Sequence, residues 1–189
     1  MIIAIKQADR VVVGYTTVDT WDCFTEQDSA DPENIAIKFT PSGQLIVFAL
    51  PVRRSDIFMY DEQFDQMTAT PKDIIKDLIP YIKRKLKENH KPLGKDGGWG
   101  NSLVICDNNN IYQVTPKLDF REDGDYMTIT PFDLAGTVKS VLDATTSLSV
   151  EERMVKVLKL VEKVHKQSLF PLIITDTKTQ QFKVIYKGE

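Results

Sequence analysis

Few side chains in this sequence have both the type and the spacing that catalysis requires. The chain contains two cysteines, Cys23 and Cys106, and two histidines, His90 and His165. Two cysteines are too few for a disulfide framework and have no metal-ligand spacing, so we interpret both as reduced thiols. Neither histidine lies in a recognisable catalytic arrangement, and no histidine lies near Cys23 in the sequence. We therefore predict no metal site and no cofactor.

Three polar segments could be mistaken for ligand sites. Gly94-Lys95 is followed by Asp96, whereas a phosphate loop has Ser or Thr after its lysine and joins a strand to a helix. The turn that begins at Asp107 lacks the Gly and the Glu of a calcium loop. Residues 119–125 are rich in carboxylates but have no further ligands that we can identify. We interpret the first two segments as connections and the third as an exposed loop.

The composition excludes several classes of function. A chain of 189 residues with 42% hydrophobic residues can build one core, so we expect a single domain over residues 1–189. The net charge of -3 provides no basic field that would attract nucleic acid. No stretch approaches the roughly 20 apolar residues of a membrane span. We expect a soluble cytoplasmic protein without a nucleic-acid or membrane partner.

Apolar runs bounded by turn residues predict antiparallel hairpins. The first hairpin occupies Met1 to Gly14, where two apolar runs flank a polar turn. A chain that starts with such a run has its first strand in the core. Further hairpins are predicted at residues 34–50, 102–116 and 170–186.

Capping residues and apolar spacing predict the helices. Thr70-Pro71 begins one helix, and Thr130-Pro131 begins another that runs to about residue 145. Ser149 and Glu152 form a capping box at the start of a third, and a short helix is expected within residues 53–66. The buried face of the first helix is predicted to comprise Ile74, Ile75, Leu78, Ile79, Ile82 and Leu86. This order favours an α+β fold of two antiparallel sheets packed face to face and covered by helices, which is a four-layer αββα sandwich.

The order of these elements and several local sequences resemble the proteasome β-subunit and bacterial HslV family. The similarity lies in the N-terminal hairpin, the helix before Lys91, the runs 101–105 and 111–116, and the paired helices joined at residues 148–153. It covers nearly the whole chain, without an invariant motif. Members of this family are N-terminal nucleophile hydrolases, in which the hydroxyl of a terminal Thr attacks and its own α-amine takes the proton. The resemblance implies this fold.

The residues at the family's nucleophile position are different in this chain. Met1 carries a thioether, which cannot attack, and removal of Met1 would expose Ile2, which is no nucleophile either. Cleavage before Thr16-Thr17 would create a terminal Thr. However, it would remove the hairpin that fills the core, and Tyr15 stands where processing usually has Gly. We therefore expect the threonine peptidase chemistry to be absent.

The other catalytic positions of the family are also changed. The family's acidic residue follows the second strand, where the nearest carboxylate here is Asp19. Its lysine lies in the third strand, and Lys38 is in that region, although the neighbouring strand aligns Ala36 with the matched position. Its Gly-Ser-Gly turn is replaced by Ile129-Thr130-Pro131-Phe132. The residues at or near family positions are thus Met1, Thr16, Thr17, Asp19, Lys38 and Thr130.

Three hypotheses follow from the sequence. The leading one is a proteasome-like or HslV-like subunit fold that lacks threonine peptidase activity and acts in assembly or binding, with a ring-like homo-oligomer by analogy to the family. The second is an activated or self-processed N-terminal nucleophile peptidase or amidohydrolase. The third is a small-ligand binding module that uses Trp21, Phe24 and Trp99 around a cleft, unless these aromatics are ordinary core or rim residues.

Overall fold

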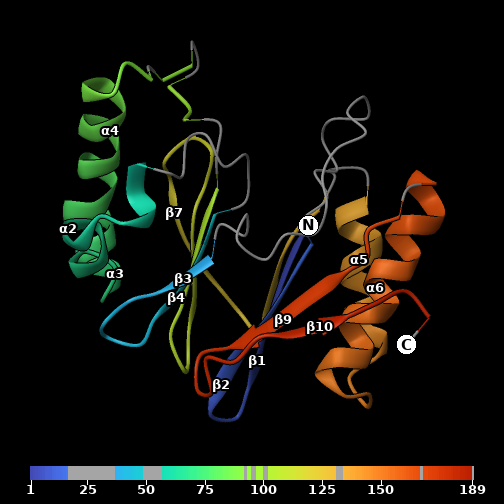
Figure 1. Ribbon diagram of the computed structural model, residues 1–189. Coiled ribbons are helices and arrows are strands. Elements are labelled where there is room, and N and C mark those ends of the chain that lie inside the picture. The colour runs from blue at the N-terminus through green and yellow to red at the C-terminus, as the bar shows by residue number, and fades with distance from the viewer. Residues whose placement is uncertain are drawn as a thin grey trace.

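Two antiparallel sheets form the centre of the molecule (Figure 1). The computed structural model describes residues 1–16, 37–48, 57–91, 93–94, 97–99, 102–130, 134–166 and 168–188. One five-stranded sheet, here called the β1 sheet, has the order β10-β9-β2-β1-β8. Its strands are β1 (Ile2–Gln7), β2 (Arg10–Thr16), β8 (Tyr126–Ile129), β9 (Leu172–Asp176) and β10 (Lys183–Ile185).

The other five-stranded sheet, here called the β5 sheet, has the order β3-β4-β5-β6-β7. Its strands are β3 (Ile37–Phe39), β4 (Leu45–Phe48), β5 (Leu103–Cys106), β6 (Ile111–Val114) and β7 (Phe120–Asp123). The expected exposed loop at residues 119–125 is therefore wrong, because residues 120–123 pair with β6. Charged side chains are common on strands at the edge of a sheet, where they discourage pairing with other chains. The carboxylates of this segment are therefore compatible with an edge strand and do not indicate a loop.

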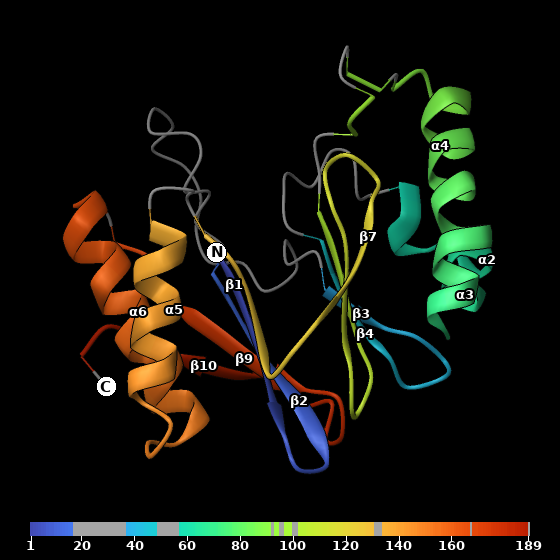
Figure 2. The ribbon, with the colours of Figure 1, turned by 180° about the vertical axis from the view of Figure 1, so that it is seen from behind.

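Helices cover the outer face of each sheet (Figure 2). On the β5 sheet lie α2 (Glu62–Gln66), α3 (Pro71–Asp73), the π-helical turn η2 (Ile74–Leu78) and α4 (Ile79–Glu88). On the β1 sheet lie α5 (Ala135–Ala144) and α6 (Val150–His165). The layers are helix, sheet, sheet and helix, which confirms the predicted α+β sandwich.

Alternation along β1 distributes its side chains between two apolar clusters. Ile2 and Ala4 pack between the sheets, whereas Ile3 and Ile5 pack under α5 and α6. A strand that is buried on both faces has a continuous apolar sequence, and residues 2–5 have such a sequence. Cys106 lies fully buried between the sheets, and this burial raises the pKa of its thiol. Cys106 is a free thiol, as predicted, while Cys23 lies outside the described residues.

The helix at residues 71–88 begins as predicted but contains a widened turn. Thr70 caps it, since its Oγ1 accepts a hydrogen bond from the Asp73 N–H at 3.2 Å. Within η2 the N–H of Ile79 reaches back five residues to the carbonyl of Ile74. Pro80 has no N–H to donate, which favours an irregular turn just before it. The extra residue shifts the helical spacing, so Ile75 is 50% exposed and the predicted buried position there is wrong.

The two helices on the β1 sheet test the other capping predictions. Ser149 and Glu152 form the predicted capping box, with Glu152 Oε2 accepting from the Ser149 N–H at 2.9 Å. Thr130, by contrast, is not the cap residue of α5. α5 begins at Ala135, after Leu134, and Thr130 directly follows β8 instead. Pairing of β8 with β1 extends the strand to Ile129, the residue before Thr130, so sheet formation prevails over the local helix signal.

Candidate functional site

The register of β1 with its two neighbours aligns three residues at one end of the β1 sheet. Ile2 pairs with Tyr15 of β2 and with Ile129 of β8. The next residue on each strand continues this row, so Met1 lies between Thr16 and Thr130. We call Thr16, Met1 and Thr130 the N-terminal row. It lies at the end of the sheet that carries the label N in Figure 1.

Met1 and Thr16 are joined by hydrogen bonds from both directions. The α-ammonium of Met1 donates to Thr16 Oγ1 at 2.9 Å, and the Thr16 N–H donates to the Met1 carbonyl at 3.0 Å. The row thus brings together an amine and a hydroxyl, the two groups that N-terminal nucleophile hydrolases use. Here, however, they belong to different residues, and Thr16 is only 2% exposed.

Both threonines of the row face the helices α5 and α6. On β2, Val12 packs into the cluster under these helices, and a Cβ at Gly14 would meet Met154 Sδ of α6 at 2.8 Å. Because side chains alternate along a strand, Thr16 lies on this same face. On β8, Tyr126 packs against the same cluster, which places Thr130 there too.

The two flanking hydroxyls differ in their hydrogen bonds. Thr16 Oγ1 accepts from the α-ammonium, whereas Thr130 Oγ1 is buried and has no hydrogen-bond partner among the residues that the structure describes. The whole Thr130 residue is only 8% exposed. A buried hydroxyl without a partner costs free energy, so native proteins rarely retain one.

Lys38 lies on the other sheet and outside this row. Its neighbours Ile37 and Phe39 pack between the sheets, so the alternation turns Lys38 toward α2. There Lys38 Nζ donates to the Phe58 carbonyl at 2.7 Å and forms an ion pair with Asp65. The lysine expected near the nucleophile position is therefore engaged in holding α2 on the β5 sheet.

The aromatic candidates are not brought together among the described residues. Trp99 is fully buried in the cluster between the β5 sheet and its helices, and its Nε1 donates to the Thr115 carbonyl at 3.0 Å. This placement agrees with the core alternative for Trp99. The remaining sequence candidates, Thr17, Asp19, Trp21 and Phe24, lie outside the described residues.

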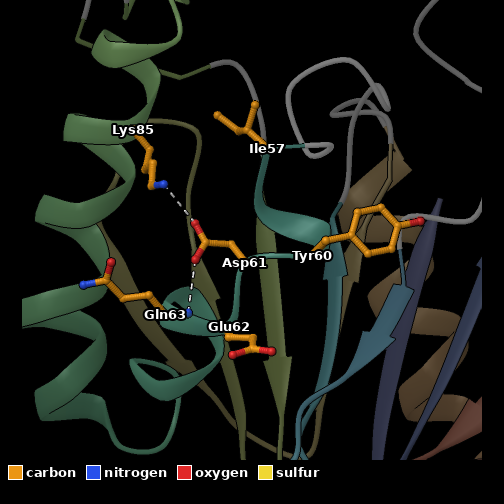
Figure 3. Close-up of a pocket in the computed structure, with 6 residues that line it drawn as sticks. All are labelled: Ile57, Tyr60, Asp61, Glu62, Gln63 and Lys85. Carbon is orange, nitrogen blue, oxygen red and sulfur yellow. Dashed lines mark hydrogen bonds and ion pairs between the residues drawn. The ribbon is translucent and has the colours of Figure 1, made fainter.

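A hollow on the outer helical layer was not anticipated from the sequence (Figure 3). At its centre Asp61 caps α2, since Oδ1 accepts from the Gln63 N–H at 3.1 Å and from the Phe64 N–H at 3.3 Å. Asp61 Oδ2 accepts from the Tyr81 hydroxyl and lies 3.3 Å from Lys85 Nζ. The residues that line the hollow are Ile57, Tyr60, Asp61, Glu62, Gln63 and Lys85.

The electrostatics of this hollow are those of a structural contact. Burial alone would raise the pKa of Asp61, but hydrogen bonds from Tyr81, the Phe64 N–H and Lys85 lower it below its ordinary value. The carboxylate is thus ionised and fully engaged in joining α2 to α4. Tyr60 is 94% exposed and points away from the Asp61–Lys85 pair. An Asp just before a helix is a capping signal that could have identified Asp61 from the sequence.

Two further features are absent within the described ranges. No group of three or more His, Cys, Asp or Glu side chains there could hold a metal ion. Of the helices that the structure describes, none is long and apolar enough to cross a membrane.

Comparison with known proteins gives matches in structure and none in sequence. No protein-family model and no curated protein matches the chain. Three solved structures illustrate the structural similarity. BPH of Thiobacillus denitrificans in complex with epoxomicin has a TM-score of 0.70 and 12% identity, over 93% of this chain and 96% of that one.

The other two are Anbu and HslV proteins. The helical assembly of the Anbu complex from Pseudomonas aeruginosa has a TM-score of 0.60 and 12% identity, over 100% of this chain and 87% of that one. HslV from Trypanosoma brucei has a TM-score of 0.59 and 14% identity, over 93% of this chain and 97% of that one. These likenesses establish the proteasome-type N-terminal nucleophile hydrolase fold. At such identities the activity has to be argued from the residues.

Proposed function

We propose that this chain is a proteasome-type subunit that has kept the fold, lacks the threonine peptidase chemistry, and acts in assembly or binding. The observation that carries the proposal is the N-terminal row. The first strand of the fold begins with Met1 and Ile2, which offer neither a hydroxyl nor a thiol. The hydroxyl nearest to the α-amine, Thr16 Oγ1, is buried and accepts a hydrogen bond from that amine.

Two further features support the loss of this chemistry. Lys38 is held by Asp65 on the far side of the β5 sheet, where it cannot lower the pKa of a nucleophile at the start of β1. Processing before Thr16 would remove β1, which pairs with both β2 and β8 in the middle of its sheet. A mature chain that began at Thr16 would lose the strand that holds the row together.

The proposal is tested by intact mass and by turnover. The native protein is weighed before and after incubation with epoxomicin, the compound bound in the BPH structure, and is then assayed with fluorogenic peptides. We expect a chain that starts at Met1, no adduct and no turnover. A mature chain that begins with Thr, Ser or Cys, or an epoxomicin adduct, would refute the proposal.

Residual hydrolysis is the second candidate, because an amine and a hydroxyl do meet at 2.9 Å in the row. In that case the α-amine would take the proton of Thr16, and Thr16 Oγ1 would attack. Thr16→Val removes the hydroxyl while keeping the shape. Turnover in the wild type that disappears in Thr16→Val would favour this candidate, whereas turnover that persists in the variant would exclude Thr16 as the nucleophile.

The assembly part of the proposal concerns copies of this chain. The Anbu protein of similar fold forms a helical assembly, and we propose that this chain is a cytoplasmic homo-oligomer. Light scattering at micromolar concentration should give a mass several times that of the 21.5 kDa chain. A monomer under those conditions would remove the assembly role and leave the binding role.

A further inference from the structure

We propose that the outer face of the helix formed by α3, η2 and α4 binds the acidic segment of residues 17–36 from a second copy of this chain. This interface rests on the assembly part of the proposed function and deepens it. The outer face carries a row of exposed lysines, here called the lysine row, which comprises Lys72, Lys76, Lys83 and Lys87. Residues 17–36 lie outside the described residues, so their part in the proposal comes from their sequence alone.

The spacing of the lysine row places it on the face that points away from the β5 sheet. The buried side chains of this helix recur every four residues and pack in the cluster against the sheet, and they are Ile74, Leu78, Ile82 and Leu86. The four lysines lie between these positions, at i, i+4, i+11 and i+15, and all are exposed. In both ribbon views α4 is the outermost layer on its side of the molecule, so the row faces outward (Figures 1 and 2).

The charges of the lysine row are not neutralised by the described part of the chain. None of its four lysines forms an ion pair with another described residue, because the ion pairs of this helix involve Arg84 and Lys85 instead. The row also contains two pairs of lysines that are four residues apart, and like charges at this spacing repel along a helix. An acidic partner on this face would remove the repulsion.

The helix dipole does not account for the whole row. Cations near the C-terminus of a helix are favourable, and Lys83 and Lys87 lie toward that end. Lys72, however, is the second residue of α3, within the first turn, where the positive end of the dipole disfavours a cation. Lys72 and Lys76 therefore point to a role outside the helix itself.

Residues 17–36 have the composition that such a face attracts. These 20 residues contain six acidic side chains and no basic one, although the whole chain has 27 acidic and 24 basic residues. The six are Asp19, Asp22, Glu26, Asp28, Asp31 and Glu33. The same segment contains Trp21 and Phe24, and Ile75, which precedes Lys76, is 50% exposed and offers an apolar contact beside the row. The face and the segment are thus complementary in charge and in apolar character.

A second copy is favoured over other acidic partners. The chain has a net charge of -3, so it lacks the overall positive field that attracts nucleic acid. Within one copy, residues 17–36 connect β2 of the β1 sheet to β3 of the β5 sheet, whereas the lysine row lies beyond the β5 sheet on its helical side. Each copy has one lysine row and one acidic segment. The contact is therefore head-to-tail, and its repetition closes a ring or extends a helical assembly.

The experiment compares four forms of the full chain by light scattering at micromolar concentration and low salt. The face variant is K72Q/K76Q/K83Q/K87Q, and the segment variant is D19N/D22N/E26Q/D28N/D31N/E33Q. The control variant, K139Q/K156Q/K159Q/K163Q, changes four exposed lysines of α5 and α6, so its net charge equals that of the face variant. Substitutions of exposed side chains leave the fold intact, and thermal unfolding checks this for each variant.

The face variant and the segment variant should each have the mass of a single 21.5 kDa chain, whereas the wild type and the control variant should assemble. Mixing the face variant with the segment variant should restore a complex of two chains, because one supplies the acidic segment and the other the lysine row. In about 1 M salt, charges farther apart than about 3 Å are largely screened, so the wild type should dissociate.

A synthetic peptide of residues 17–36 gives a second measurement that needs no variant protein. An excess of this peptide should occupy the lysine row and reduce the wild type to single chains. The same peptide with its six acidic residues replaced by Asn or Gln should leave the assembly unchanged.

The proposal is overturned if the wild type is a single chain, if the face variant keeps the mass of the wild type, or if the control variant loses it too. It is also overturned if the two folded variants do not combine, or if the acidic peptide leaves the assembly unchanged. An assembly that every variant retains would refute this interface and leave the assembly role. Epoxomicin adduct formation and turnover do not involve the lysine row, so the loss of peptidase chemistry is tested separately.

Discussion

The N-terminal row and the hollow at Asp61 are both polar sites at the ends of secondary elements, but their polar groups are paired to different degrees. Around Asp61, both carboxylate oxygens are engaged, by two backbone N–H groups, a tyrosine hydroxyl and a lysine. In the row, the Thr16 hydroxyl is engaged, whereas the Thr130 hydroxyl has no partner among the residues that the structure describes. A complete network stabilises the fold, whereas a buried hydroxyl without a partner costs free energy.

In the structure, Lys38, Thr130 and Asp61 have roles that differ from those their residue types and positions suggest. Lys38 stands in the strand where the family has a catalytic lysine, yet it holds α2 on the β5 sheet, through an ion pair with Asp65 and a hydrogen bond to the Phe58 carbonyl. Thr130 looks like a helix cap in the sequence, yet it lies in the N-terminal row, where its hydroxyl has no partner among the described residues. The perturbed pKa of Asp61 likewise reports a structural contact and not a reactive group.

The largest effect is expected from Lys38→Ala. The side chains of Lys38 and Asp65 are 10% and 15% exposed, so the substitution leaves a nearly buried carboxylate without its partner. We expect the free energy of unfolding to fall by about 3 kcal/mol, measured by denaturant titration. Lys85→Ala, at a lysine side chain that is 31% exposed, is the control and should cost much less, because water screens its ion pair. Equal losses in the two variants would contradict a structural role that is specific to Lys38.

Asp61→Ala should have the next largest effect, because it removes the cap of α2 and the partner of Tyr81. We expect a loss of about 2 kcal/mol, measured in the same way near neutral pH. The pKa of Asp61 is lowered in the folded state, so its contribution is present above the unfolded pKa of about 4 and is lost as the pH falls through the folded pKa. The difference between wild type and Asp61→Asn should therefore shrink in acid. A difference that is constant between neutral and strongly acidic pH would contradict this account.

The smallest changes in stability are expected for Thr16→Val and Thr175→Val, and the two changes should have opposite signs. Thr16→Val removes a hydroxyl that accepts from the α-ammonium, and it should lower the free energy of unfolding by about 1 kcal/mol. Thr175→Val removes a buried hydroxyl that has no partner among the described residues, and it should raise the free energy of unfolding by up to about 1 kcal/mol. Thermal unfolding of both variants, without added ligand, measures the two changes in the free energy of unfolding. A loss of stability in Thr175→Val would show that its hydroxyl has a partner after all.

Much of the fold could be predicted from the sequence because its signals are local. The hairpin at the N-terminus, the Thr70 cap and the Ser149 capping box depend on residues within a few positions of one another. The errors arose where a distant partner or an irregular helical turn decided the outcome. Residues 120–123 form a strand because β6 lies beside them, and Ile75 is exposed because the π-helical turn shifts the spacing.

The candidate site could be predicted only in part. The absence of a nucleophile at Met1 and Ile2 is visible in the sequence, and so are Thr16 and Thr130 as residues near family positions. That these two threonines flank Met1 follows from the insertion of β1 between β2 and β8, strands far apart in the chain. Asp61 was missed because its capping signal was hidden in a segment of mixed helix and loop character.

The sequence by itself determined the class of fold and the side-chain chemistry at its first residues, Met1 and Ile2, since apolar periodicity, caps and side-chain type are properties of the residues themselves and their neighbours. Only the tertiary structure decided which polar groups find partners. It turned Lys38 outward to Asp65, joined Thr16 to the α-ammonium, and left Thr130 without a hydrogen bond to any described part of the chain. The physical reason is that hydrogen bonds and ion pairs depend on distances between strands and helices, which the order of residues along the chain does not specify.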